Sequence, residues 1–328
     1  MVAGTVRAGI GSRPCHTDGM DLHDPSEVVA ALAEHGYLAD EGLATAIFLA
    51  LRLGRPLLLE GEAGVGKTEV AKVLARWTGG ELIRLQCYEG IDAAQAVYEW
   101  DYPRQLLHLR AAEAAGPSAT GADGPERVDE LTDQLFSERF LVRRPLLRAI
   151  SPTDDGVRPV LLVDEVDRAD DEFEAFLLEI LSDYAVTVPE LGTFRAEVPP
   201  VVVITSNRTR DVHDALKRRC LYHWVEHPDF EREVAIVRVR APEVSDRLAR
   251  QVAAATESFR EAGMYKPPGV AETIDWAQAL ALLGRDELDE ASVSATLGSV
   301  LKYREDQQRA RHDGLGRLVE AAQRRSGT

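Results

Sequence analysis

The sequence predicts an α/β protein in which a doubly wound parallel sheet is followed by a smaller all-helical domain. Five segments have the composition of strands, and three of them are apolar on successive residues, as strands buried on both faces must be. Helical patterns separate these strands, and after residue 228 only helical patterns remain. We therefore expect an α/β domain over residues 26–228 and a helical domain over residues 229–328.

The expected strands are short and end in polar or charged residues. They have the sequences PLLLE near residue 56, ELIRLQ near 81, PVLLVD near 159, PPVVVITS near 199 and LYHWVE near 221. The clearest helix between them is DEFEAFLLEILSDY, in which the apolar residues recur at helical spacing and leave the acidic residues on the other face. In the helical domain we expect helices over roughly 230–240, 243–262, 270–283, 289–299 and 301–323.

Two segments are predicted to be irregular. Residues 1–25 are glycine-rich and lack the apolar core of a signal peptide, so we expect a disordered leader. Residues 114–130 are rich in Gly, Pro, Ala and Asp and lie between two helical patterns, which is typical of an exposed loop.

Composition excludes several classes of protein. The formal net charge of −17 repels nucleic acid, and no long basic run offsets it. The three cysteines are too far apart for a zinc site and odd in number, which favours a reduced, cytoplasmic environment. The longest uncharged apolar run, residues 43–51, is too short to cross a membrane, so no membrane insertion is expected.

Residues 61–68, GEAGVGKT, match the phosphate-binding pattern G-x-x-x-x-G-K-[ST]. In such a loop the glycines let backbone N–H groups approach the phosphates, the lysine reaches the β and γ phosphates, and the hydroxyl binds Mg²⁺. A predicted strand precedes the loop and a helical pattern follows it, as the pattern requires. The residues expected to bind ATP are Gly61, Glu62, Ala63, Gly64, Val65, Gly66, Lys67, Thr68 and Glu69, with Thr68 also binding Mg²⁺.

Two further strands end in polar side chains. PVLLVDEVDRAD ends a buried strand in Asp164 and Glu165, and a buried carboxylate is costly unless a cation or water compensates it. We expect Asp164 to hold Mg²⁺ and Glu165 to polarise the attacking water. VVVITSNRTRD ends in Ser206 and Asn207, and a neutral amide can orient that water without adding charge. The carboxyl ends of parallel strands share one edge, so all three sites should converge.

These motifs resemble the AAA+ ATPases of the MoxR family, most closely the CoxD-like branch. The matching stretches include GEAGVGKTE, PVLLVDEVDRADDEFEAFLLEILSDYAVTVPELGTF, PPVVVITSNRTRDVHDALKRRCLYHW and KPPGVAETIDWAQAL. The resemblance implies a sheet order of 5-1-4-3-2, a helical lid and a hairpin after Tyr184. It also implies a homo-oligomer, a hexameric ring with ATP at the subunit interfaces, and a von Willebrand A-domain protein as partner.

The resemblance also implies an arginine that completes the site of a neighbouring subunit. Within DALKRRC, Arg219 is the first choice for this arginine finger and Arg218 the alternative. The lid of many relatives contributes a further arginine to the phosphates, but KPPGVAETIDW offers Glu272 and no arginine. Either Lys266 or another lid residue takes that place, or the contact is absent.

The sequence therefore favours a Mg²⁺-dependent ATPase that remodels or activates a partner protein, by resemblance in metalloenzyme maturation or cofactor insertion. Three alternatives are a P-loop kinase for a small molecule, a restriction-type motor acting on nucleic acid, and a nucleotide-gated scaffold. Asn207 and the paired carboxylates argue against the kinase, and the net charge argues against the motor. Glu165 argues against a scaffold that does not hydrolyse ATP. The client protein and the pathway are not encoded in any motif.

Overall fold

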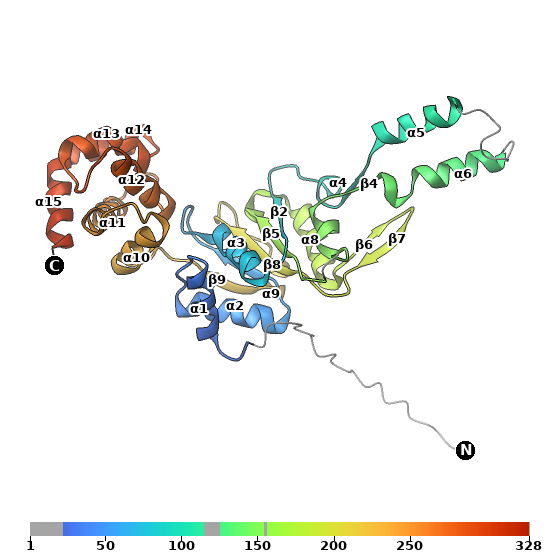
Figure 1. The fold of residues 1–328 in the computed structure, drawn as a ribbon, viewed down its shortest axis with the longest axis horizontal. Coiled ribbons are helices and arrows are strands. Elements are labelled where there is room, and N and C mark those ends of the chain that lie inside the picture. Colours follow the sequence, from blue (N-terminus) through green and yellow to red (C-terminus); the bar gives the residue numbers. More distant parts are fainter. Residues whose placement is uncertain (1–21, 115–124, 154–155, 328) are drawn as a thin grey trace, which may run out of the picture.

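The computed structural model describes residues 22–114, 125–153 and 156–327. A five-stranded parallel sheet forms the centre of the molecule, and a separate group of helices follows it at one end (Figure 1). In spatial order the sheet consists of β2 (Leu82–Gln86), β5 (Val160–Asp164), β8 (Val201–Ser206), β1 (Leu57–Glu60) and β9 (Leu221–Trp224). When these five strands are numbered along the chain and read from β9 to β2, their order is 5-1-4-3-2, which confirms the prediction.

Alternate residues of the central strands enter two different cores. Leu57 and Leu59 of β1 pack with helices on one face of the sheet, whereas Leu58 packs with helices on the other. Both faces are therefore covered, which explains why these strands are apolar on successive residues. The first layer consists of α1 (Pro25–Glu34), α2 (Glu41–Leu53) and α3 (Lys67–Thr78), and the second of α7 (Pro145–Ile150), α8 (Asp171–Asp183) and α9 (Asp214–Arg219).

The segment expected to be a disordered leader includes residues that the structure places against the core. Residues 1–21 lie outside the described residues, but Leu22 is buried in the core that contains α1 and α2. The Asp24 side chain accepts a hydrogen bond from the Ser26 amide and caps α1, which starts at Pro25. The prediction of a disordered leader is therefore wrong for residues 22–25, because an apolar side chain and a helix cap anchor them.

An insertion between β2 and β5 forms an arm that projects at the end of the molecule opposite the C-terminal helices (Figure 1). The short α4 (Ala93–Ala96) leads into antiparallel strands β3 (Tyr98–Trp100) and β4 (Leu141–Arg143), which enclose α5 (Tyr102–Ala114) and α6 (Pro125–Leu135). The expected loop over 114–130 is wrong for Ala114, which ends α5, and for residues 125–130, since proline suits the first turn of a helix and α6 begins there. Residues 115–124 lie outside the described residues. The hairpin expected after Tyr184 is confirmed as β6 (Ala185–Val188) and β7 (Gly192–Arg195).

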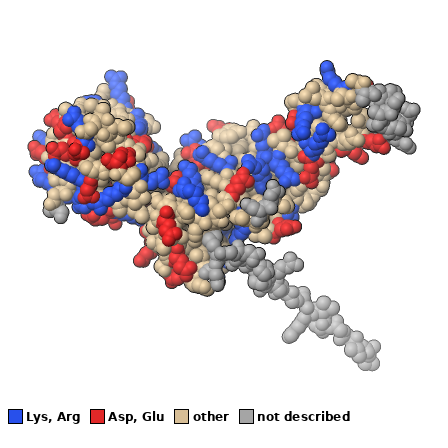
Figure 2. Space-filling view, viewed as in Figure 1, with Lys and Arg blue, Asp and Glu red and all other residues tan. Residues whose placement is uncertain are grey.

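The C-terminal helices have their own core, which surrounds the fully buried Trp276. They are α10 (Phe230–Arg240), α11 (Asp246–Glu261), α12 (Val270–Leu282), α13 (Glu290–Val300), α14 (Arg304–Asp313) and α15 (Leu315–Ser326). The single helix expected over 301–323 is wrong, because Gly314 has φ +97° and ψ 105° and separates α14 from α15. Acidic and basic side chains are interspersed over this region on the face shown in Figure 2. Within the described ranges, no helix is long and apolar enough to cross a membrane.

Candidate nucleotide site

The phosphate loop connects β1 to α3 and depends on glycine where its backbone is crowded. A Cβ atom on Gly61 would lie 2.4 Å from the carbonyl oxygen of Val225. Gly64 has φ +82°, a conformation that other residues rarely adopt, and it touches Gly269 of the C-terminal helices. The N-terminus of α3 therefore opens directly onto the loop, with backbone amides available for an anion.

Lys67, the first residue of α3, is almost entirely enclosed by protein. Only 5% of it is exposed, and its Nζ donates to the backbone oxygens of Gly61 at 2.8 Å and Glu62 at 2.6 Å. Burial lowers the pKa of Lys67 to about 8, while the carboxylates of Asp167, Asp164 and Glu165 act in the opposite direction. A buried ammonium whose charged form is disfavoured would be stabilised by an anionic ligand, which fits a phosphate group.

Asp164, at the end of β5, is the most heavily hydrogen-bonded group of the site. Its Oδ1 accepts from the hydroxyls of Thr68 at 3.0 Å and Thr205 at 2.6 Å. Its Oδ2 accepts from Nε of Arg84 at 3.0 Å and from Nη2 at 2.6 Å. Because Asp164 is 2% exposed, these donors offset the cost of burying its charge. Thr68 and Asp164 are thus held together, as the sequence predicts.

Glu165 follows in a left-handed backbone conformation, with φ 56° and ψ 52°. Thr205 holds this turn, because its Oγ1 accepts a hydrogen bond from the Glu165 amide at 2.9 Å. The Glu165 carboxylate accepts from Nδ2 of Asn207 at 3.2 Å and from Nε2 of Gln86 at 3.1 Å. Strained backbone of this kind typically costs about 1–3 kcal/mol and is found where a side chain must be aimed at a functional site.

The backbone of Asn207 is fixed by a buried carboxylate. Asp167 accepts from the amide of Asn207 at 3.1 Å, and from the amide of Thr209 at 2.8 Å and its hydroxyl at 2.6 Å. Burial disfavours the charged form of Asp167, but these hydrogen bonds keep its pKa below the usual value, and the bond from the Thr209 hydroxyl has the largest effect among them. The carboxylate therefore stays charged and locks the loop that carries Asn207.

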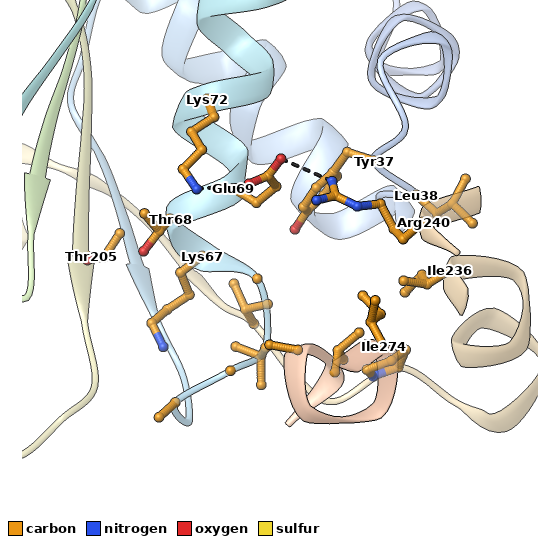
Figure 3. Close-up of a pocket in the computed structure, with 18 of the residues that line it drawn as sticks. Tyr37, Leu38, Lys67, Thr68, Glu69, Lys72, Thr205, Ile236, Arg240 and Ile274 are labelled. Carbon is orange, nitrogen blue, oxygen red and sulfur yellow. Dashed lines mark hydrogen bonds and ion pairs between the residues drawn. The ribbon is translucent and has the colours of Figure 1, made fainter. Parts of the chain in front are cut away.

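These groups line a cavity of about 360 Å³ between the sheet edge, α3 and the C-terminal helices. Figure 3 shows its other end, where Tyr37, Leu38, Ile236 and Ile274 form an apolar wall. The carboxylate of Glu69 faces Arg240 across this region, with an oxygen-to-nitrogen distance of 3.1 Å. Burial opposes ionisation, but Arg240 and the cations on α3 hold the pKa of Glu69 below its usual value. One end of the cavity is thus apolar and the other suits phosphate, a combination that fits a nucleotide.

The structure brings most of the predicted residues to this cavity. Its lining includes Ala63, Gly64, Val65, Gly66, Lys67, Thr68, Glu69, Asp164, Glu165 and Asn207. Gly61 and Glu62 reach it through carbonyls that hold Lys67, while the Glu62 carboxylate turns to His227 at 3.2 Å. Arg218 and Arg219 do not line it, and both are exposed on α9.

The oxygen donors at Thr68 and Asp164 fit a Mg²⁺ ion, which prefers hard ligands and keeps waters or phosphate oxygens in its remaining positions. Across the part of the chain that the structure describes, no group of three or more His, Cys, Asp or Glu side chains could hold a metal ion. A magnesium ion bound here would therefore take most of its ligands from the nucleotide and from water.

Sequence reasoning missed Arg84, Gln86 and Thr205. Arg84 and Gln86 are two residues apart on β2, so both point to the same side, and β2 pairs with β5 so that Gln86 lies opposite Asp164. The available signal was a charged residue within an otherwise apolar strand. The C-terminal residues Ile236, Arg240 and Ile274 were also missed, because nothing in the sequence shows which face of a lid helix meets the cavity.

Comparison with known proteins agrees with this geometry. The model of the AAA domain (dynein-related subfamily) matches residues 56–220, half of the chain. No curated protein matches significantly.

Solved structures that the chain matches include a candidate ATPase from Cytophaga hutchinsonii, 15% identical, covering 92% of this chain and 93% of that one with a TM-score of 0.44. A RuvB variant from Thermotoga maritima is 16% identical, covering 81% and 70% of the two chains with a TM-score of 0.45. The RuvB Holliday junction branch migration motor from Thermotoga maritima is 14% identical, covering 81% and 69% with a TM-score of 0.43. From its family match and its phosphate loop, the chain belongs to the dynein-related subfamily of AAA domains and is a P-loop ATPase.

Proposed function

We propose that the chain is a Mg²⁺-dependent AAA+ ATPase of the MoxR type, which forms a ring and uses hydrolysis to remodel or activate a partner protein. The observation that carries the hydrolytic part is the contact between Asn207 and the carboxylate of Glu165 at 3.2 Å, beside Asp164. A carboxylate and an amide aimed at one place suit the activation of a water molecule.

Each residue of the cavity then has a role toward ATP as substrate. Lys67 leaves the carbonyls of Gly61 and Glu62 to bind the β and γ phosphates, and backbone amides of the loop bind the remaining phosphate oxygens. Thr68 and Asp164 would hold Mg²⁺, which would neutralise charge that develops on the phosphates. The apolar wall near Tyr37 and Ile274 receives the base.

Glu165 accepts the proton of the attacking water. Its carboxylate accepts from the side-chain amides of Asn207 and Gln86 and forms an ion pair with Arg168, whose Nε lies 3.0 Å from Oε2. Asn207 is itself fixed through Asp167, so it can orient both the carboxylate and the water. Such general-base assistance contributes typically about 10² to 10⁴ in rate.

Lys266 is our choice for the cation that the C-terminal helices present to the phosphates. Its repulsion contributes to lowering the pKa of Lys67, after burial, so the two ammonium groups act on each other through space. Its backbone amide donates to the buried carboxylate of Asp306 at 3.0 Å, which fixes the turn. A phosphate bound near Lys67 would be attracted by the charge of Lys266 as well.

The exposed arginines at the end of α9 support a site completed by a neighbouring copy. Neither Arg218 nor Arg219 lines the cavity of its own chain, so in this proposal the arginine finger acts on the nucleotide bound by another copy. We assign Arg219 as the finger and keep Arg218 as the alternative. In this proposal residues 26–228 form the nucleotide-binding domain and residues 229–328 form the lid. Copies of the chain assemble into a ring, and the family resemblance implies six subunits.

The partner protein is proposed from the family resemblance. The β6–β7 hairpin and the arm of α5 and α6 project from the nucleotide-binding part and offer surfaces for other proteins (Figure 1). By resemblance the partner is a von Willebrand A-domain protein, and the role is metalloenzyme maturation or cofactor insertion in the cytoplasm.

The variant Glu165→Gln tests the hydrolytic role. An amide keeps the shape of the side chain but cannot accept the proton, so Mg²⁺-ATP should bind normally while turnover falls by about 10² or more. Size-exclusion chromatography of this variant with ATP should show a ring. Loss of binding together with turnover would make Glu165 a structural residue. Turnover that requires a small-molecule acceptor or a nucleic acid would support a kinase or a motor instead.

A further inference from the structure

The helix that carries the exposed arginines is too short to hold its own position. α9 has six residues, Asp214–Arg219, with Lys217, Arg218 and Arg219 in its last turn. A helix of this length is not stable by itself, and its last carbonyl groups have no partners within the helix. The placement of Arg218 and Arg219 therefore depends on contacts from elsewhere in the chain.

Arg55 supplies the contact at the end of α9. Its Nε donates to the carbonyl oxygen of Arg219 at 3.1 Å, and its Nη2 donates to those of Arg218 at 2.9 Å and Cys220 at 3.2 Å. One planar guanidinium thus satisfies three consecutive carbonyls. Its positive charge also faces the negative end of the helix dipole, which adds to the attraction.

A second contact joins the same helix to the other end of β1. The Nζ of Lys217 lies 3.9 Å from Oε1 of Glu60, a carboxylate that is 2% exposed. The Ser206 hydroxyl donates to the same oxygen at 3.2 Å and keeps it in place. Arg55 precedes β1 and Glu60 ends it, so the strand that leads into the phosphate loop holds α9 at two points.

The side chains of the two arginines have no such support. Both are exposed, and neither forms an ion pair with another described residue. Their reach is therefore set by where the backbone of α9 ends, which is the part that Arg55 holds. A displacement of about 1 Å of a catalytic group can lower a rate by roughly 10²-fold.

We propose that Arg55 is a positioning residue that holds the last turn of α9, so that its exposed arginines are presented to the phosphates bound by a neighbouring copy. This inference rests on the proposed completion of each site by its neighbour. Arg55 itself touches no nucleotide in this proposal and acts through the backbone of Arg218 and Arg219.

The variant Arg55→Ala should bind ATP with an unchanged Kd, because Arg55 does not line the cavity, and should still assemble. Its turnover should fall roughly tenfold to a hundredfold, less than the loss expected on removing the finger itself, about 10³ to 10⁵. Arg55→Lys, which keeps the charge but not the planar fork, should give an intermediate value. The matched control is Arg52→Ala, which removes a hydrogen bond to the carbonyl of Leu22, away from α9, and should leave turnover unchanged.

Mixing subunits provides the decisive readout. Lys67→Ala subunits cannot bind ATP but present correctly held arginines, so mixing them with Arg55→Ala subunits should recover turnover that neither variant shows alone. General destabilisation by Arg55→Ala would not be corrected by a neighbour. Normal turnover of Arg55→Ala overturns the inference. The inference is also overturned if the mixture of Arg55→Ala with Lys67→Ala stays inactive while a mixture of Lys67→Ala with Arg219→Ala or Arg218→Ala recovers turnover. If no mixture recovers although subunits exchange, the site shared between neighbours is itself wrong and the inference falls with it.

Discussion

Gly269 allows a sharp test of how the C-terminal helices meet the phosphate loop. Its backbone has φ −84° and ψ −179°, which alanine adopts freely, so Gly269→Ala introduces no backbone strain. The added Cβ would lie 2.7 Å from Cα and 2.8 Å from the carbonyl carbon of Gly64, and 2.9 Å from the oxygen of Ala63. All three atoms belong to the backbone, so no side-chain rotation can relieve the overlap.

The size of the effect follows from these distances. Carbon atoms in contact are normally about 3.5–4.0 Å apart, so the loop and α12 must separate by roughly 0.8 Å or more. Overpacking of this kind costs typically about 1–3 kcal/mol. Val270, Ala271 and Ile274 line the cavity and move with Gly269, so the cost appears in ATP binding. Converted at 1.4 kcal/mol per factor of ten, the Kd for ATP should rise roughly fivefold to 150-fold.

Titration of a fluorescent ATP analogue, together with urea denaturation, measures both parts of this prediction. The matched control is Gly298→Ala within α13, where the new Cβ would meet only Nε2 of Gln307 at 3.7 Å. This control should leave the Kd unchanged and raise the free energy of unfolding by up to about 1 kcal/mol. If Gly269→Ala binds ATP as tightly as the unmodified chain, the two glycines are not in contact in the form that binds nucleotide.

Two further predictions concern Lys266 and Asp167. Lys266→Ala should weaken ATP binding while leaving the affinity for ADP unchanged, because the proposed contact is to the terminal phosphate. Lys266→Arg, which keeps the charge, should bind ATP as tightly as the unmodified chain. Equal losses of affinity for ATP and ADP would contradict the role. Asp167→Asn should lower the free energy of unfolding by about 2–4 kcal/mol, since one of the two oxygens that accept from Asn207 and Thr209 becomes an NH₂ group, which cannot accept. The folded-state pKa of Asp167 is lowered, so its stabilisation is complete above its ordinary pKa and is lost as pH falls through the folded value. The difference between the two proteins in urea denaturation should therefore shrink below about pH 4, and a difference that stays constant into acid would show that the charge is not responsible.

Much of the phosphate end of the site could be predicted from the sequence. The loop pattern at Lys67, the carboxylates after β5 and the amide after β8 each follow a buried strand, and parallel strands bring their carboxyl ends to one edge. Local pattern and topology are enough for this, because each group stands next to the element that positions it. The five strands and the helix over α8 were predictable for the same reason, since their apolar spacing reflects burial.

Tertiary structure alone decided which distant groups meet these residues. Arg84 reaches Asp164 across 80 residues, and Arg55 reaches Arg218 across 163, because neighbouring strands and helices place them side by side. No spacing rule connects such pairs. The contact of Gly64 with Gly269 likewise depends on how the C-terminal helices dock, which no local pattern encodes. The sequence therefore determined the chemistry at the sheet edge through periodicity and strand topology, whereas the partners that hold and enclose it were decided by packing between elements far apart in the chain.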